Sequence, residues 1–292
     1  MDRDACQFLE LEEGRRIAFA EYGTPAGRPV FFFHGWPSSR MMAELTDLPA
    51  RELGLRIISP DRPGIWDSTF QANRRLLDWP PVVEALANHL GIRRFHVLAI
   101  SGGAPYAFAT GHRLGDRVRA LGIISGAVPF SDLTDHRGLL PLYRWMIWFY
   151  RHQPRLLRAI FYLVRPIASL ELLLRMARSL LRTLPPADAE ALRDSRAFNI
   201  CFESQRKAWG SSADGVIADA EIYGRPWGFE LSEVRVPVRL WHGKQDRAFA
   251  FQLAEDVAKR LPNCVAKMVD NEGHFSLPIR HMREILSDLV AI

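Results

Sequence analysis

Phe95-His96-Val97-Leu98-Ala99-Ile100-Ser101-Gly102-Gly103 is the stretch that decides which fold this chain of 292 residues is expected to adopt. Its first six residues are almost wholly apolar, as in a strand buried on both faces. A helix of small residues, 104–112, is predicted directly after the glycines. A sharp turn from a buried strand into a helix exposes a serine hydroxyl, and its crowding requires small residues two positions before and after the serine. Ala99, where glycine is commoner, and Gly103 meet this requirement, so Ser101 is predicted to be a nucleophile. The alternative is a glycine-rich turn without chemistry.

Similar apolar runs occur on both sides of this stretch. An N-terminal β-hairpin is predicted around Glu13-Gly14, from residues 8–11 and 15–21. Buried strands are predicted at residues 30–33, 56–59, 120–125, 238–241 and 265–269. Helices are predicted from about residues 39 and 78 and at 251–261 and 281–290. Short apolar strands that alternate with helices predict an α/β fold with a mostly parallel, doubly wound sheet covered on both faces.

The alternation stops between residues 130 and 230, where helical patterns dominate. We therefore predict a core domain of residues 1–129 and 231–292 that carries a helical cap or lid of residues 130–230. The cap sequence from 139 to 184 is rich in large apolar residues and arginines. One interpretation is a cap that packs its apolar side on the core, with its arginines in solvent. The other is a lid over a hydrophobic acyl-binding pocket, and the basic rim of this lid attracts an anionic surface or substrate. Both predict a hydrophobic pocket beneath it.

Two turns predict the donors that acyl transfer requires. Such an enzyme needs two N–H groups aimed at the oxyanion that develops in the transition state. Gly102 follows the predicted nucleophile and opens a helix, where free N–H groups favour an anion. The loop His34-Gly35-Trp36-Pro37 follows the strand at 30–33. It is positioned to supply the second donor through the N–H of Trp36, although it could also be a simple strand-ending turn.

Two further loops supply candidates for an acid and a base. Asp246 follows the strand at 238–241, and His274 follows the last strand, within Asn271-Glu272-Gly273-His274. A carboxylate there could orient a histidine that activates Ser101. The order Ser, Asp, His is the order in which one large hydrolase fold presents these three residues. His242, His281 and His34 are weaker candidates for the base, and His34 is expected to stabilise the oxyanion loop instead.

These motifs together resemble the α/β-hydrolase fold family, which includes esterases, epoxide hydrolases, haloperoxidases and proline iminopeptidases. The resemblance extends from about Arg15 to Val290. It is carried by the motifs at 34–37, 61–64, 101–103, 243–246 and 273–274, and it is weak between 130 and 230. It implies a Ser101–Asp246–His274 triad with oxyanion donors at Trp36 and Gly102. Because some relatives place the acid after an earlier strand, Asp132 is an alternative to Asp246.

The sequence departs from the family pattern at Trp66. Relatives usually have a second glycine two positions after Asp-Arg-Pro-Gly, here residues 61–64, and Trp66 stands in its place. A glycine is kept where the backbone needs a positive φ or a close approach. Trp66 is therefore expected to cover the pocket mouth, or the loop is expected to follow another course. Together with His34, Gly35 and Ile100, it is counted as a pocket or supporting residue.

Composition excludes several other classes of protein. The net charge is +5, but no lysine-rich run or nucleic-acid motif accompanies it, so no nucleic-acid partner is expected. Three widely spaced cysteines argue against a disulfide framework and a zinc site. No signal peptide or spanning segment is evident, so a cytoplasmic protein is expected. Neither a cofactor nor a metal is required.

The sequence thus predicts a serine hydrolase that cleaves a carboxylic ester or related acyl bond of a hydrophobic small molecule through an acyl-enzyme. Serine at position 101 argues against relatives with an aspartate nucleophile, and so against epoxide and haloalkane hydrolysis. The alternatives are amide, peptide or carbon–carbon cleavage or a cofactor-free oxidation by the same triad, and a non-catalytic ligand-binding homologue. The basic, apolar cap leaves open a peripheral contact with a membrane, and the sequence does not fix the oligomeric state.

Overall fold

The computed structural model describes residues 6–133, 136–170, 178–179, 181–210 and 212–292. Within them, eight strands form one sheet in the order β1-β2-β4-β3-β5-β6-β7-β8. β1 pairs antiparallel with β2, which pairs antiparallel with β4, and the remaining pairs are parallel. The strands are β1 (Gln7–Glu10), β2 (Arg16–Gly23), β3 (Arg28–Phe33), β4 (Leu55–Pro60), β5 (Phe95–Ile100), β6 (Val118–Ile124), β7 (Val238–Gly243) and β8 (Cys264–Val269).

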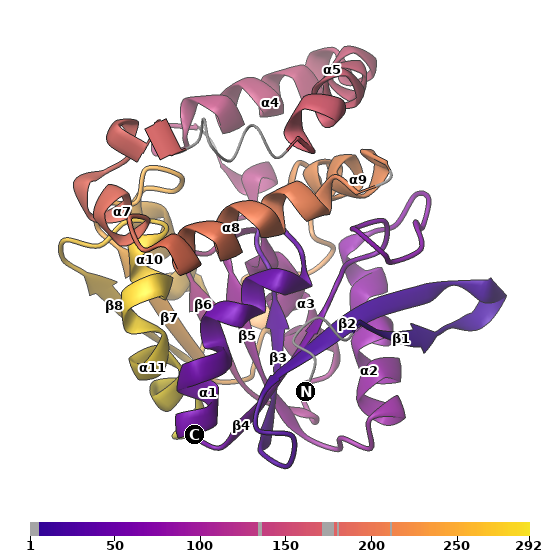
Figure 1. Cartoon of the computed structure of the whole chain (residues 1–292), viewed down its shortest axis with the longest axis vertical. Helices are drawn as coiled ribbons and strands as arrows, with labels where there is room; N and C mark the ends of the chain where they lie inside the picture. Colours follow the sequence, from indigo (N-terminus) through magenta and orange to yellow (C-terminus); the bar gives the residue numbers. More distant parts are fainter. Residues whose placement is uncertain (1–5, 134–135, 171–177, 180, 211) are drawn as a thin grey trace.

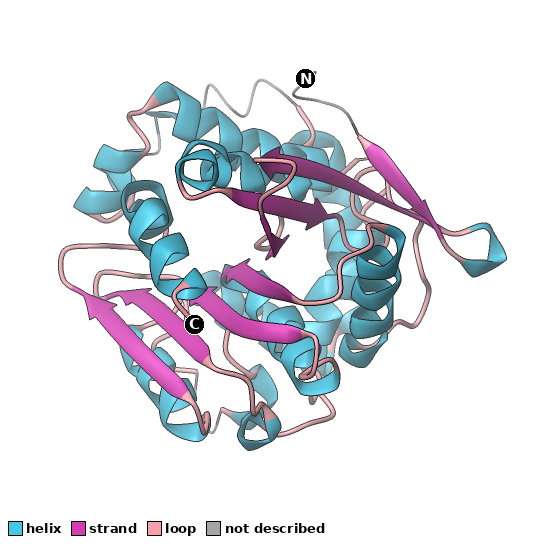
Figure 2. Ribbon diagram, turned by 90° about the horizontal axis from the view of Figure 1, so that it is seen from below, coloured by secondary structure: helices cyan, strands magenta, loops and turns pink. Residues whose placement is uncertain are grey.

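Helices cover both faces of this sheet (Figure 2). One face carries α1 (Asp47–Glu52) and α11 (Ser276–Val290), and the other carries α2 (Trp79–His89), α3 (Ala104–Arg113) and α10 (Phe251–Arg260). The predicted doubly wound, mostly parallel sheet is therefore confirmed.

The wholly apolar β3 shows why these strands have no polar side. Val30 and Phe32 pack in the cluster beneath α1 and α11, whereas Phe31 and Phe33 pack in the cluster beneath α2 and α3. Successive side chains of a strand point to opposite faces, so a strand in the middle of a covered sheet must be apolar at every position. All four side chains are buried.

A group of helices lies between β6 and β7, over the ends of the strands (Figure 1). We call them the insertion helices: α4 (Pro141–His152), α5 (Pro154–Ala168), α7 (Pro186–Ala191), α8 (Ser195–Ala208) and α9 (Asp214–Tyr223). Their location agrees with the predicted helical insertion, and the domain boundaries at 129/130 and 230/231 stay a prediction. Within the described residues, no helix combines the length and apolar character needed to span a bilayer.

Two helix starts differ from those expected. The last helix begins at Ser276 rather than near 281, because Asp188 of α7 accepts the N–H groups of Phe275 and Ser276 and so holds the first turn. Pro278 is tolerated there because the first N–H groups of a helix have no partner within it. The helix expected from about 39 is a 3₁₀ helix, Arg40–Thr46, that leads into the short α1.

Candidate active site

Ser101 occupies the turn between β5 and α3 in a strained backbone conformation. Its φ is +52°, a left-handed value that residues with a Cβ rarely adopt. The turn is as crowded as the sequence predicts. A Cβ on Gly103 would overlap the carbonyl oxygen of Phe33, and one on Gly102 would lie 2.6 Å from the Tyr223 hydroxyl. Glycine at both positions therefore lets the turn sit directly against the end of β3.

The structure brings Ser101, His274 and Asp246 together in one chain of hydrogen-bond contacts. The Nε2 atom of His274 lies 3.1 Å from Ser101 Oγ, and its Nδ1 atom lies 2.8 Å from Asp246 Oδ2. The other carboxylate oxygen of Asp246 accepts the N–H groups of Ala248 and Phe249, at 2.7 and 3.1 Å. The loop after β7 thus fixes the carboxylate that orients the imidazole.

Opposing effects set the pKa values of this pair. Burial by itself lowers the pKa of His274, but the nearby Asp246 carboxylate and its hydrogen bond raise that pKa above its ordinary value. For Asp246, burial raises the pKa, while the charge and hydrogen bond of His274 outweigh burial and hold it below its ordinary value. Asp246 is therefore a carboxylate at neutral pH, and the imidazolium form of His274 is stabilised.

The alternative acid and bases contact groups other than Ser101. Asp132 forms an ion pair with Arg260, at 2.7 Å. His281 contacts Glu272 and Glu284, both at 3.3 Å. The Nε2 atom of buried His242 contacts the carbonyl of Phe249, at 2.9 Å, and lies 3.5 Å from Asp246 Oδ2, and burial lowers the pKa of this histidine. Of the candidate acids, Asp246 is the one placed against His274.

Arg62 orients the predicted oxyanion loop. Its guanidinium donates to the carbonyl oxygens of His34 and Gly35, at 2.7 and 2.8 Å. Because a peptide is planar and trans, a carbonyl of Gly35 held on one side directs the N–H of Trp36 to the other. His34 is fully buried, and its Nδ1 contacts the Gly35 carbonyl at 3.1 Å, in keeping with a supporting role. Burial lowers its pKa, so His34 is neutral.

The peptide between Ser101 and Gly102 is held in a comparable way. The N–H of Ala127 donates to the carbonyl of Ser101, at 2.9 Å, and therefore directs the N–H of Gly102 to the opposite side. The Tyr223 hydroxyl donates to the carbonyl of Gly102, also at 2.9 Å. Both predicted donor peptides thus have a fixed orientation before any ligand arrives.

A buried ionic cluster anchors Arg62 to an insertion helix. The Nε of Arg62 donates to Asp219 of α9 at 2.8 Å, and the Tyr106 hydroxyl donates to the same carboxylate at 2.6 Å. Arg74 forms an ion pair with Asp219 as well. Burial raises the pKa of Asp219, but the two arginines outweigh burial and lower that pKa to about 2. Asp219 is fully buried and charged, so its position determines that of Arg62.

A second insertion carboxylate holds the loop that carries His274. Asp188 of α7 is buried and accepts the backbone N–H groups of His274, Phe275 and Ser276, at 3.1, 2.9 and 2.8 Å. A Cβ on Gly273 would lie 2.5 Å from this carboxylate. Asp188 therefore fixes the backbone from which His274 projects, and its charge contributes to raising the pKa of that imidazole.

Trp66 requires a correction to the sequence analysis. It does have a positive φ, +46°, so the loop keeps the backbone shape for which relatives use glycine. Its ring lies under the guanidinium of Arg40, 3.8 Å from ring centre to Cζ, and 5.0 Å from Lys207 Nζ. It is not among the described residues that line either cavity at Ser101. Trp66 thus stabilises the loop from outside and covers no pocket mouth.

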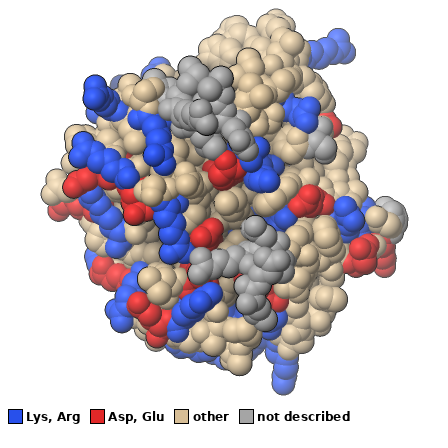
Figure 3. Space-filling model, viewed as in Figure 1, with Lys and Arg blue, Asp and Glu red and all other residues tan. Residues whose placement is uncertain are grey.

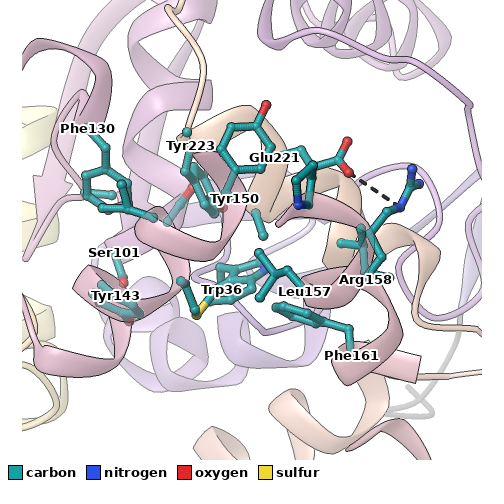
Figure 4. A pocket seen from close by; sticks show the side chains of 18 of the residues that line it. Trp36, Ser101, Phe130, Tyr143, Tyr150, Leu157, Arg158, Phe161, Glu221 and Tyr223 are labelled. Carbon is teal, nitrogen blue, oxygen red and sulfur yellow. Dashed lines mark hydrogen bonds and ion pairs between the residues drawn. The ribbon is translucent and has the colours of Figure 1, made fainter. Parts of the chain in front are cut away.

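Two cavities meet at Ser101. The first, with about 690 Å³ of empty space including some open to solvent, extends beneath α4, α5 and α9. Figure 4 shows Ser101 at one end of it and an ion pair between Arg158 and Glu221 at the other. Most of the residues that line it are apolar: Trp36, Ala127, Phe130, Met146, Ile147, Pro154, Leu157, Phe161, Ile217, Ala220 and Phe249. This agrees with the predicted hydrophobic pocket.

The second cavity lies on the other side of Ser101 and has about 980 Å³ of empty space, again partly open to solvent. His274, Gly35 and Ile100 line it together with the polar side chains of Gln205 and Arg247. Trp36 and Tyr143 line both cavities and stand between them. A molecule bound at Ser101 can therefore extend in two directions.

No group of three or more His, Cys, Asp or Glu side chains suited to a metal ion occurs in the described part of the chain. Cys6, Cys201 and Cys264 are free thiols.

Sequence reasoning missed Asp188, Arg62, Asp219 and Tyr223. Arg62 lies in the recognised 61–64 motif, whereas Asp219 and Tyr223 lie between residues 130 and 230, where the resemblance is weak. The motif could have indicated a role for Arg62. Nothing in the sequence near Asp188 indicates its partners, which lie 86 to 88 residues away.

Comparison with known proteins identifies the family. Residues 28–279 match the family model described as alpha/beta hydrolase fold. A non-heme haloperoxidase of Rhodococcus erythropolis is 32% identical over 117 residues, which cover 39% of this chain and 42% of that protein. The chain spans less than half the length of the curated relatives it matches.

Two solved structures show the same fold. The bromoperoxidase of Bacillus anthracis superposes with a TM-score of 0.72 at 16% identity, covering 98% of this chain and 99% of the other. The esterase of Exiguobacterium antarcticum superposes with a TM-score of 0.69 at 18% identity, covering 98% of each chain. Together with the match over most of the sequence, these findings show that the chain belongs to the α/β-hydrolase fold family.

Proposed function

We propose that this protein is a serine hydrolase that cleaves a carboxylic ester or related acyl bond in a hydrophobic small molecule. The observation that carries the proposal is the contact of His274 with both Ser101 and Asp246, at 3.1 and 2.8 Å, at the end of an apolar cavity. A nucleophile is activated by an adjacent base, which a third group orients.

The proposed reaction follows from these contacts. His274 accepts the proton of Ser101 Oγ as the oxygen attacks the substrate carbonyl. The N–H groups of Trp36 and Gly102 stabilise the oxyanion, and Asp246 stabilises the imidazolium. His274 then protonates the leaving alcohol. A water molecule, deprotonated by His274, cleaves the acyl-enzyme and releases the acid.

The two cavities suggest how a substrate is divided. We assign the apolar part of the substrate to the first cavity because its lining is dominated by aliphatic and aromatic side chains. The remaining part occupies the second cavity, near Gln205 and Arg247. An ester that is apolar on both sides, with a polar group able to reach Gln205 or Arg247 in the second cavity, fits this arrangement.

Amide or peptide cleavage is less well supported. A peptidase that recognises a free amino terminus needs an unpaired carboxylate near the nucleophile. Among the described lining residues of the first cavity, Glu221 is the one carboxylate, and it is paired with Arg158 and Arg225, at 3.5 and 3.3 Å. A non-catalytic binder would have no use for the oriented donors and base at Ser101. Two of the similar proteins are named as a haloperoxidase and a bromoperoxidase. A cofactor-free oxidation by the same residues is therefore a second candidate function.

A fluorophosphonate probe tests the activated serine directly. The purified protein is incubated with the probe, and its intact mass is compared with that of Ser101→Ala treated in the same way. We expect one adduct on the wild-type protein and none on the variant. Ser125→Ala, which removes a buried serine with the comparable φ of +48° after another strand, is the matched control and should still be labelled.

A folded wild-type protein that remains unlabelled would overturn the proposal and favour a binding protein. Labelling that survives Ser101→Ala would move the nucleophile to another residue. Once labelling is established, 4-nitrophenyl esters of increasing chain length and matching anilides separate the candidate reactions. We expect esters to be cleaved faster than anilides, with a preference for chains long enough to fill the first cavity.

A further inference from the structure

The outer side of α4 and α5 carries exposed apolar side chains. Leu142, Trp145 and Trp148 of α4 are 53%, 41% and 51% exposed, and Leu163 and Ile167 of α5 are 73% and 54% exposed. Within each helix, successive residues of this set are three or four positions apart, and such neighbours lie close together on the helix surface. We call these five residues the outer apolar face. Figure 3 shows the top of the molecule, where Figure 1 places α4 and α5, as mainly tan.

The same helices are also apolar on their inner side. Tyr143, Ile147 and Leu157 line the first cavity and pack against the core or beneath α9. A surface helix needs one apolar stripe, and a helix that is apolar on opposite sides is normally covered on both. Tryptophan is also the side chain that favours a boundary between an apolar phase and water. The outer apolar face is therefore expected to be covered by a binding partner.

The charge around this face identifies the partner. Residues 136–170 contain six arginines and not one aspartate or glutamate. Arg144, Arg151 and Arg155 are exposed, and no ion pair is recorded for them among the described residues. Two acids of α9 that contact α5 are already engaged: Glu221 pairs with Arg158, and Asp214 accepts the Tyr162 hydroxyl.

We propose that α4 and α5 form a docking surface for an anionic lipid bilayer. The outer apolar face enters the boundary between headgroups and acyl chains, while the arginines extend along their stems to the anionic headgroups. A protein partner would need an acidic rim around an apolar groove, and a second copy of this chain would bring arginines against arginines. A bilayer satisfies both the apolar and the cationic side chains at once.

Docking would bring the first cavity close to the membrane. Arg158 and Pro154 of α5 line its far end, and the Arg158 side chain is 50% exposed. A lipophilic ester could then pass from the bilayer to Ser101 without crossing water. This consequence rests on the proposed hydrolase function, whereas membrane binding does not.

Co-sedimentation of the full chain with vesicles tests the proposal. Vesicles of phosphatidylcholine are compared with vesicles that also hold about 30% phosphatidylglycerol. We expect binding to the anionic vesicles, strong weakening at about 0.5 M salt, and little binding to phosphatidylcholine alone. Brominated lipids in the same vesicles should quench tryptophan fluorescence of the wild-type protein, which requires no substitution.

Two variants divide the contributions. Arg144→Gln, Arg151→Gln and Arg155→Gln together should lower the partition coefficient roughly a hundredfold, at about fivefold for each arginine. Trp148→Glu with Leu163→Glu should abolish binding.

Two control variants make the same chemical changes elsewhere. The triple variant Arg93→Gln, Arg119→Gln and Arg235→Gln removes equal charge near the opposite ends of the strands. Leu48→Glu with Val265→Glu alters side chains that are 57% and 58% exposed. Both should bind as the wild type does.

Several outcomes would overturn the proposal. Equal weakening by the two triple variants would show that net charge, and not this surface, attracts the vesicles. Absence of binding and of quenching would exclude a membrane partner. A dimer in light scattering that Trp148→Glu with Leu163→Glu dissociates, without vesicle binding, would identify a second copy instead. Ser101→Ala should bind vesicles as the wild type does, so a failure of the proposed reaction remains distinguishable.

Discussion

Two non-glycine residues with positive φ illustrate how single positions shape this molecule. Ser101 and Trp66 have φ values of +52° and +46°. At Ser101 the strained turn aims the hydroxyl at His274, with Oγ 3.1 Å from Nε2. At Trp66 the same kind of strain serves no chemistry, and contacts with Arg40 and Lys207 offset it. A strained residue thus orients a reactive group at one position of this chain and is held only by packing at the other.

Substitutions of Trp66 should separate strain from packing. Trp66→Ala loses the ring contacts but keeps the strained φ, whereas Trp66→Gly loses the contacts and relieves the strain. We therefore expect the glycine variant to be more stable than the alanine variant by about 1 kcal/mol, the usual cost of a left-handed conformation. Denaturant unfolding of both measures this difference. An alanine variant as stable as the glycine variant would show that this backbone is relaxed, and both should keep probe labelling at Ser101.

Asp246→Asn should change the pH dependence of the reaction as well as its rate. The His274 base works in its neutral form, so kcat/KM of the wild type rises with pH through a pKa above about 6.5. An amide cannot stabilise the imidazolium, so the variant's acid limb should move to lower pH. The rate itself should fall roughly a thousandfold or more.

The pH–rate profile of an ester that the wild type cleaves makes this measurement. Asp132→Asn is the control, since Asp132 is paired with Arg260 at the surface. An acid limb that stays in place in Asp246→Asn would mean that another group sets the pKa of His274.

At the scale of elements, α7 and the loop after β8 depend on each other. Asp188 of α7 accepts three successive N–H groups, from His274 to Ser276, at the start of α11. A carboxylate at the N-terminus of a helix also interacts favourably with the helix dipole. One carboxylate thus determines where α11 begins and where the imidazole is placed.

Asp188→Asn should therefore impair the rate more than substrate binding. An amide oxygen accepts these N–H groups less strongly, so His274 moves relative to Ser101. We expect kcat to fall about tenfold or more, KM to change little, and the acid limb to move slightly to lower pH because a charge that raises the pKa of His274 is lost. Steady-state kinetics over pH makes the test.

Glu190→Gln is the matched control for this prediction. It lies on the same helix and pairs with Arg280 at the surface, so it should leave kcat unchanged. If Asp188→Asn lowered stability alone, with kcat and the pH profile intact, Asp188 would be a structural residue without influence on the base.

The elements that sequence predicted best are those whose signal is local. β5 was predicted at residues 95–100, and the structure has it at Phe95–Ile100. The prediction succeeds because consecutive residues determine both the buried strand and the glycine turn after it. The true start of α11 was missed because it depends on Asp188, far away in sequence. For Trp66 the sequence left a pocket cover and another course of the loop open, because its partners, Arg40 and Lys207, come from two distant segments.

At the scale of the whole molecule, a buried ionic cluster joins the sheet to the insertion helices. Asp219 of α9 binds Arg62, which in turn holds the carbonyls of His34 and Gly35. Removing one partner of a buried ion pair leaves the other uncompensated. The integrity of the proposed oxyanion loop is therefore tied to the stability of the entire fold.

Asp219→Asn should destabilise the protein by about 3–5 kcal/mol, because two buried arginines lose their counter-ion. The pKa of Asp219 is about 2 in the folded protein and about 4 when unfolded, so this carboxylate stabilises the fold above pH 4. That contribution, about 2.5 kcal/mol, is lost as the pH falls from about 4 to 2. Denaturant unfolding across this range should show the loss in the wild type and its absence in the variant.

Asp270→Asn is the control for acid stability, since Asp270 is 76% exposed and pairs with Lys244. It should leave both the stability and its pH dependence nearly unchanged. An Asp219→Asn variant with wild-type acid sensitivity would show that other carboxylates govern the transition.

The two carboxylates that Asp188 and Asp219 extend to the core also limit how this protein can diverge. Consider a chimera that takes its helices between β6 and β7 from a distant homologue. Unless that homologue carried matching acids, three N–H groups would lose their acceptor and two buried guanidinium groups would lose their carboxylate partner. The polar side-chain contacts found for the described α4 and α5 reach other residues of the segment between β6 and β7. New substrate preferences are therefore expected to evolve by point substitutions in these two helices. Replacement of the whole insertion is expected to require compensating substitutions in the core.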